Sequence, residues 1–525
     1  MPRYRPAMPR YRPAMPRLLT RRDLTDDENR VLRAVCLLAL LVLVVPSSYV
    51  YLLLPMLTDF GAGSGLAALF RALPSIASLL VIFPAGGLAM RLGPRRVLVA
   101  SGVLVTVGSA AVLMAPGAIV ALVGMVLLSV GRSVLLIIII ALLTAATTRE
   151  GARHVAFSAY GAVDSAAFVV APVFAGLLVT VVSWRAVAAL WVLSGMGLVV
   201  VARSLVSPDG ERPAVLGELW TPAAAGVVLT AMVQAFFAVD RSGWASLAVL
   251  GWGAVALAAL AVLAVLMGRI PAPTVNPAVL RRGGLLLLLL VVVLIPFANL
   301  WFYTNAKLQY VYGISALGAA FLAAPAQMAS VAGAALMDGF IKAKGITKSG
   351  TTMLVAAAAT LFAAGLQTGS TPVVVLVVVL CLYGASVAAA EVALATAVMN
   401  RSVPGTESTV ASFRGAAVGL GGALGVIFMS TVVSIGVHQA YAERSEDDLG
   451  RDQLMEVLRA VHEGQPTAEI AGWSQLPESE IEGLAAHETE AMVVGFRSQA
   501  IGGALVTLGA AGVFYVARRR HPDED

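Results

Sequence analysis

The stretch LAALFRALPSIASLLVIFPAGGLAMRLGPRRVLVASGVLVTVGSAAVLMA, residues 66–115, places a short basic loop between two long apolar runs. Each run has about the 20 apolar residues that an α-helix needs to cross the hydrocarbon core of a bilayer. The loop between them holds Arg91, Arg95 and Arg96. Because arginine and lysine collect in cytoplasmic loops, this stretch predicts a membrane-crossing helical hairpin that turns on the cytoplasmic side.

The rest of the chain has the same character. Of its 525 residues, 59% are hydrophobic and 13% are charged, and the mean hydropathy is +0.87, far outside the range of soluble domains. The net charge of +6 comes from basic residues at the ends of apolar runs, where they meet lipid headgroups, so no nucleic-acid partner is expected. Cys36 and Cys381 lie within apolar runs, which predicts neither a disulfide framework nor a metal site.

Fourteen apolar runs are long enough to be counted as transmembrane spans, in the order six, two and six. They are Val35–Met56, Leu66–Ala89, Val97–Ala115, Ile119–Ala145, Val155–Val182, Ala186–Val201, Ala223–Ala238, Ala245–Leu266, Leu285–Tyr303, Ala316–Leu336, Thr351–Leu366, Val373–Met399, Val410–Val437 and Val493–Val516. With the N-terminus inside, basic residues collect in every cytoplasmic loop, from Arg91 to Arg520, and both termini are predicted to be cytoplasmic. The predicted fold class is an all-α polytopic membrane protein.

These spans define the predicted domains. They are a basic cytoplasmic tail over residues 1–34, a six-helix bundle over 35–206, two additional helices with linkers over 207–282, a second six-helix bundle over 283–517 and a cytoplasmic tail over 518–525. The second bundle includes an acidic extracytoplasmic segment, residues 438–492. There Leu454 and Val457 recur at helical spacing, and a second helix is expected to start near Pro477 and run into the last span.

The loop GGLAMRLGPRR resembles a motif of the major facilitator superfamily, close to GxLaDRxGRR. The matching residues of this predicted gating loop are Gly86, Leu88, Arg91, Gly93, Arg95 and Arg96. Met90 stands where the family usually has aspartate. Glycines permit a tight reversal between packed helices, and the arginines reach carbonyls and carboxylates at neighbouring helix ends.

Further matches follow in the order the family has them. Arg132 falls where the family keeps an arginine on the cavity face of its fourth span. The residues Ala171, Pro172, Ala175 and Gly176 are similar to the family's antiporter pattern GPxxGG, although ordinary helix packing is the alternative explanation. Residues 307–325 resemble the stretch before the tenth span of fourteen-span drug:proton antiporters. The resemblance implies a major facilitator fold, with two six-helix bundles and two extra central helices.

Many members of that family carry an aspartate in the first span, whereas here the position holds Pro46. Coupling to protons must then use another acid, and the candidates are Asp164 in the fifth span and Glu391 in the twelfth. A carboxyl group inside a membrane cavity can bind and release protons. Arg132 is the expected partner of Asp164, and a static structural ion pair is the alternative. For Glu391 the alternative is a polar residue near the cytoplasmic end of its helix.

Other polar residues are candidates for contact with a solute. The predicted substrate-cavity residues are Arg71, Asn299, Asn305, Lys307 and Gln309. The last four follow Pro296, where a broken helix facing a cavity would present hydrogen-bonding groups; a hydrated loop is the alternative. Arg414 and Arg497 are interpreted as side chains that snorkel to an interface, as is Arg71 if it does not reach the cavity.

Enzyme motifs and cofactor motifs are missing from the sequence, which contains neither a Walker loop nor a GxSxG elbow. The resemblance instead implies a secondary active exporter of hydrophobic or amphipathic compounds, coupled to protons and working by alternating access. We expect it to act as a monomer in a bacterial cell membrane, plasma or inner. Two alternatives are an exporter of a lipid, envelope precursor or natural product with non-standard coupling, and a sensor or scaffold that no longer transports.

Overall fold

The computed structural model describes residues 24–520, apart from residues 62–63, 148–149, 207–217, 243–245, 404–405 and 443–452 and shorter gaps within 271–282, 301–315 and 455–465. The secondary structure of the described residues is helical throughout. Twelve of these helices are long and apolar enough to cross a membrane. They are α1 (Asp26–Asp59), α2 (Ser64–Leu92), α3 (Pro94–Leu113), α4 (Ala118–Ala146), α5 (Glu150–Val181), α6 (Trp184–Ser204), α7 (Trp220–Ser242), α8 (Leu247–Arg269), α12 (Ile346–Gly365), α13 (Val373–Met399), α14 (Glu407–Ala442) and α17 (Glu478–Arg520).

Two of the fourteen predicted spans are not among these twelve. The predicted span Leu285–Tyr303 falls on the ten-residue helix α9 (Leu285–Leu294) and the 3₁₀ turn η3 (Ile295–Ala298). Pro296 lies in this turn; it has no N–H to donate, which favours a break in the α-helix here. The predicted span Ala316–Leu336 falls on the longer helix α11 (Ala316–Lys344). Helices therefore occupy all fourteen positions, but the count of fourteen spans is not confirmed.

The first helix begins earlier than its apolar run. Thr25 caps α1, because its side chain accepts a hydrogen bond from the backbone N–H of Glu28 while the Glu28 carboxylate accepts one from the N–H of Thr25. This reciprocal capping box marks a helix start that hydropathy does not detect. Residues 26–34 of the predicted tail are therefore helical, and residues 1–23 lie outside the described residues.

The helices pack as two bundles. In the first, α3 packs against α4 and α6, α1 packs against α5 and α6, and α2 packs against α4; in the second, α11 and α12 pack against α13, and α17 packs against α12 and α14. Two seams join the bundles, α5 against α11 and α2 against α14. Of the additional helices, α7 packs against α2, α14 and α8, whereas α8 exposes most of its apolar side chains.

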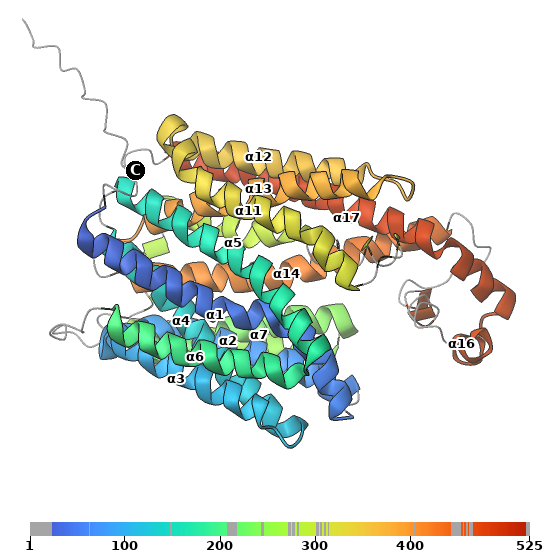
Figure 1. The fold of residues 1–525 in the computed structure, drawn as a ribbon, viewed down its shortest axis with the longest axis horizontal. Coiled ribbons are helices and arrows are strands. Elements are labelled where there is room, and N and C mark those ends of the chain that lie inside the picture. The colour runs from blue at the N-terminus through green and yellow to red at the C-terminus, as the bar shows by residue number, and fades with distance from the viewer. Residues whose placement is uncertain are drawn as a thin grey trace, which may run out of the picture.

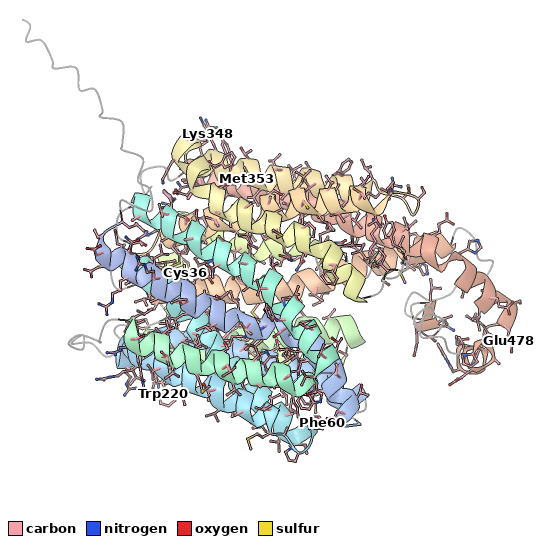
Figure 2. The ribbon with its side chains drawn as sticks, in the orientation of Figure 1. Cys36, Phe60, Trp220, Lys348, Met353 and Glu478 are labelled. Atoms are coloured by element: carbon pink, nitrogen blue, oxygen red, sulfur yellow. The ribbon has the colours of Figure 1, made fainter. Side chains whose placement is uncertain are left out.

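The two ends of the molecule differ in charge. Figure 1 shows that α1 begins and α17 ends at the same end of the molecule, and Figure 2 places Trp220 and Lys348 at that end. Phe60 and Glu478 lie at the opposite end (Figure 2). We call the first the basic end, defined by Arg91, Arg95, Arg96, Lys348 and Arg518, and the second the distal end, which carries the acidic segment.

At the distal end, the described part of the acidic segment packs together. It contains the short helix α16 (Thr467–Ser474), which Figure 1 shows beyond the ends of the long helices. Leu454, Val457 and Ile470 are buried there together with residues from α14 and the first turns of α17. The helix predicted to start near Pro477 is confirmed, since α17 begins at Glu478 and continues for 43 residues.

Candidate functional site

A cavity of about 800 Å³ lies between the two bundles. Its wall comes from α1, α2, α4 and α5 of the first bundle, from α9, η3, α13 and α14 of the second, and from α7. Most of the lining side chains are aliphatic or aromatic. Pro46 is one of them, so the position where the resemblance to drug:proton antiporters implies an aspartate faces the cavity.

Among the described residues, four charged side chains line this cavity, and they come from both bundles. They are Arg132 on α4, Asp164 on α5, Glu391 on α13 and Arg414 on α14. Asp164 and Arg414 are half-buried, and Glu391 is exposed, although its exposed surface borders the cavity. The structure thus brings together the three residues predicted to handle protons, and it adds a fourth charge that the sequence did not place there.

The two carboxylates share one cation. Arg414 interacts electrostatically with both Asp164 and Glu391, and the two carboxylates also act on each other. The Tyr160 side chain, one turn before Asp164, lies within range of all three charges. Among the described residues, neither carboxylate forms a hydrogen bond or an ion pair within 4 Å, so the cluster is not a closed salt bridge.

A glycine lets the helices that carry the two carboxylates approach closely. A Cβ on Gly161 would lie 2.7 Å from Cγ2 of Val392 and 3.4 Å from Cβ of Ala334. Gly161 is one turn from Asp164, and Val392 directly follows Glu391. A larger side chain at residue 161 would separate the two acids, because carbon atoms normally approach no closer than about 3.5 Å.

The expected pairing of Arg132 with Asp164 is wrong. Arg132 lines the same cavity, but the charge that acts on Asp164 is that of Arg414, from the opposite bundle. The interpretation of Arg414 as a snorkelling side chain is wrong for the same reason. Its Nε atom is buried without a hydrogen-bond partner among the described residues. The sequence did carry a signal, since an arginine seven residues into an apolar helix is costly in lipid.

Of the predicted substrate-cavity residues, the structure describes the side chains of Asn299 and Lys307, and neither lines this cavity. Asn299 follows η3 and is not part of the lining. Lys307 is buried elsewhere in the second bundle, where its Nζ donates a hydrogen bond of 3.3 Å to Oε1 of Gln367. Lys307 lies outside the membrane-spanning segments, and burial lowers its pKa to about 8. Asn305, Gln309 and the side chain of Arg71 lie outside the described residues.

The replacement Lys307→Met is therefore expected to leave solute affinity within about twofold of wild type, because the lysine lies away from the cavity. Methionine retains the length of the side chain and removes a charge whose burial is unfavourable. Equilibrium binding of a fluorescent amphiphile to purified protein measures this, with Gln367→Met as the matched control. A tenfold loss of affinity in Lys307→Met alone would return this residue to the solute site.

The predicted gating loop lies at the basic end. Gly93 has φ +90°, a conformation that favours glycine, and it precedes α3. Arg95 donates a hydrogen bond to the carbonyl of Arg203 at the end of α6, and Arg91 is exposed. Gly86 lies against α14, where a Cβ would come within 3.0 Å of Oγ of Ser412. The loop and the adjoining end of α2 thus contact α6 of the first bundle and α14 of the second.

Hydrogen bonds at the basic end join the two bundles. Ser412 Oγ on α14 donates to the carbonyl of Ile82 on α2 over 3.1 Å. Arg153 near the start of α5 donates to Oδ1 of Asn400 over 3.0 Å and to the carbonyl of Met399 over 3.3 Å. The basic end is therefore closed in this conformation, on the side of the cavity where Arg414 lies.

The residues of the predicted antiporter pattern pack within the first bundle. Ala171 and Ala175 are buried, and Ala175 lies in a cluster with residues of α1 and α6 such as Leu52 and Trp191. Pro172 lies inside α5, and Gly176 is half-buried one turn further on. The pattern lets α5 approach α1 closely, as small residues do in membrane helices.

This arrangement, two bundles around a central cavity, is the fold of the major facilitator transporters. Residues 35–207 match the family model described as Major Facilitator Superfamily. No curated protein sequence matches the chain.

Solved structures share the fold over nearly the whole chain. The human organic anion transporter MFSD10 is 14% identical, with a TM-score of 0.62 over 93% of this chain and 100% of that chain. A bacterial homologue of the iron transporter ferroportin, in its outward-facing state, is 14% identical, with a TM-score of 0.58 over 94% and 100%. The E. coli fucose:proton symporter FucP is 13% identical, with a TM-score of 0.54 over 93% and 98%.

Proposed function

We propose that this protein is a secondary active exporter of hydrophobic or amphipathic compounds, of the fourteen-span drug:proton antiporter type. It would work as a monomer in a bacterial cell membrane with both termini in the cytoplasm. The observation that carries the proposal is the apolar cavity between two bundles, lined by one carboxylate from each. An apolar wall favours an amphiphile over a sugar, whose hydroxyl groups need many polar partners.

The same observation favours proton coupling. Asp164 and Glu391 face the cavity from opposite bundles, so their surroundings change when the bundles rock. A carboxyl group takes up a proton where water reaches it from the acidic side and loses the proton when it faces the other side. Neither acid depends on the first-helix aspartate that Pro46 replaces.

Transport by the purified protein in liposomes tests the proposal. With an acidic lumen and a neutral outside, inserted protein whose basic end faces outward is expected to accumulate tetraphenylphosphonium, and each addition of this cation should release protons that a pH-sensitive dye detects. Protein-free liposomes are the control. A sensor or scaffold would move neither cation nor protons, and that result would contradict the proposal.

Export of a lipid, envelope precursor or natural product is the second candidate, and the folded acidic segment favours it. Its described residues include a buried cluster that packs against α14 and α17 at the distal end. Replacing residues 445–476 by a short Gly-Ser linker keeps α17 whole and separates the candidates. A multidrug exporter is expected to retain most tetraphenylphosphonium transport, whereas an exporter that hands its cargo over through this segment loses release of that cargo.

A further inference from the structure

Arg414 is placed so that its charge acts between the two bundles. It belongs to α14 of the second bundle, and Asp164, on α5 of the first bundle, faces it across the cavity. Glu391 also interacts with Arg414, but it lies on α13 of the same bundle. Rocking of the bundles therefore changes the distance from Arg414 to Asp164 far more than the distance from Arg414 to Glu391.

The helix that carries Arg414 also closes the basic end. Ser412, two residues before it, forms the hydrogen bond to Ile82 on α2. Gly415, the residue after it, packs against α4, where a Cβ would lie 2.4 Å from Cδ1 of Ile137. Arg414 thus lies on the part of α14 that separates from the first bundle when the basic end opens.

The other titratable groups around Arg414 do not supply an equivalent interaction. The cavity wall also contains Arg132 from α4, Tyr49 from α1 and Tyr160 from α5, and the cluster extends to Tyr383 on α13 and Cys36 on α1. The described lining from α2, α7 and α9 contains no titratable side chain. Asp164 is the carboxylate that attracts Arg414 across the interface, while the repulsion between Asp164 and Glu391 opposes closure.

We propose that Arg414 is the positioning residue through which the charge on Asp164 holds the basic end closed. When Asp164 is ionised, its attraction to Arg414 pulls the bundles together at this end. When Asp164 takes up a proton, that attraction is lost and the basic end opens. This proposal rests on the proton coupling proposed above, and it assigns that coupling a direction, since proton uptake favours the state open at the basic end.

Distance measurements between spin labels across the basic end test the proposal without any substrate. The labels are attached at Leu92→Cys on α2 and Lys348→Cys on α12, which are exposed positions on opposite bundles. The full-length protein also carries Cys36→Ala and Cys381→Ala and is reconstituted in nanodiscs. In the otherwise wild-type protein, the open fraction is expected to rise as the pH falls from 9 to 5. A constant open fraction over this range would overturn the proposal.

The variants are expected to change the ratio of closed to open protein in different directions. Arg414→Gln and Asp164→Asn should each lower the ratio of closed to open protein about tenfold at high pH. Asp164→Asn should remove the pH dependence, and Arg414→Gln should remove or reverse it, because the repulsion between the two carboxylates remains. Glu391→Gln should raise the ratio, because it removes the repulsion from Asp164 and leaves the attraction intact. Arg414→Lys keeps the cation and should restore the pH dependence, which separates the charge from the shape of the side chain.

Arg497→Gln is the control, since it removes an arginine of the same bundle that does not line the cavity and should keep the wild-type pH dependence. An unchanged pH profile in Arg414→Gln, or opening by Glu391→Gln to the same extent as by Asp164→Asn, would overturn the role of Arg414. If the spin-label distances contradict the role of Arg414 but the protein still shows proton-driven transport, the proposed function stands and only this inference fails. If the distances change as expected but the protein shows no transport, the proposed function fails and this inference stands.

Discussion

The replacement Asp164→Asn is expected to reduce proton-driven transport to the background of protein-free liposomes. Asparagine has nearly the same shape and cannot exchange a proton, so the carrier would lose the group that gains and loses a proton in each cycle. Exchange of labelled for unlabelled solute without a pH gradient should continue, because the cavity keeps its apolar wall. The difference between the two assays shows that coupling has been lost and not folding.

Asp338→Asn provides the control for that experiment. Asp338 is also a half-buried carboxylate of a long helix, but it pairs with Lys342 on α11 and does not line the cavity. Its replacement should leave proton-driven transport within about twofold of wild type. Full transport by Asp164→Asn combined with Glu391→Gln would rule out coupling through these acids.

The replacement Gly333→Ala is expected to have the largest effect on stability. On α11, a Cβ at Gly333 would lie 2.1 Å from the carbonyl oxygen of Ala385 on α13, so the two helices would have to separate. Backbone cannot move aside as a flexible side chain can, and overpacking of this kind costs about 3 kcal/mol. We expect a lower thermal unfolding midpoint in detergent and a smaller yield of monodisperse protein.

Gly339→Ala on the same helix should have the opposite effect. A Cβ at Gly339 would meet no atom within 4 Å. Alanine is the better helix former by about 0.5–1 kcal/mol, so this change should raise the unfolding midpoint. Equal shifts in the two variants would show that helix propensity, and not the α11–α13 contact, determines the result.

The sequence predicted the helical architecture well because hydropathy and loop charge report on it directly. The long apolar runs of α4 and α13, for example, leave little doubt that both cross the membrane. Boundaries that depend on hydrogen bonds were less predictable. The capping box at Thr25 starts α1 within a charged segment, and the turn around Pro296 shortens the predicted ninth span. Neither feature changes the mean hydropathy of the surrounding residues, so hydropathy does not detect it.

The sequence predicted which carboxylates belong to the candidate site but did not predict which arginine interacts with them. Asp164 and Glu391 were predicted because a charged residue within an apolar run is costly in lipid and is therefore a candidate for function. Arg414 carries the same signal, but its role depends on which face of α14 turns inward. Hydropathy does not fix that rotation, because close contacts such as Gly161 against Val392 and Gly415 against Ile137 determine it.

The position of α7 has a consequence for solutes that arrive dissolved in the bilayer. This helix packs along α2 and α14 and contributes Val233 and Phe237 to the cavity wall, and α8 covers its outer side. The boundary between the halves on that flank is thus shielded from lipid by two layers of helix. A molecule dissolved in the bilayer is therefore separated from the cavity by both α7 and α8 on this flank, whereas on the other flank the packed seam of α5 and α11 lies between them.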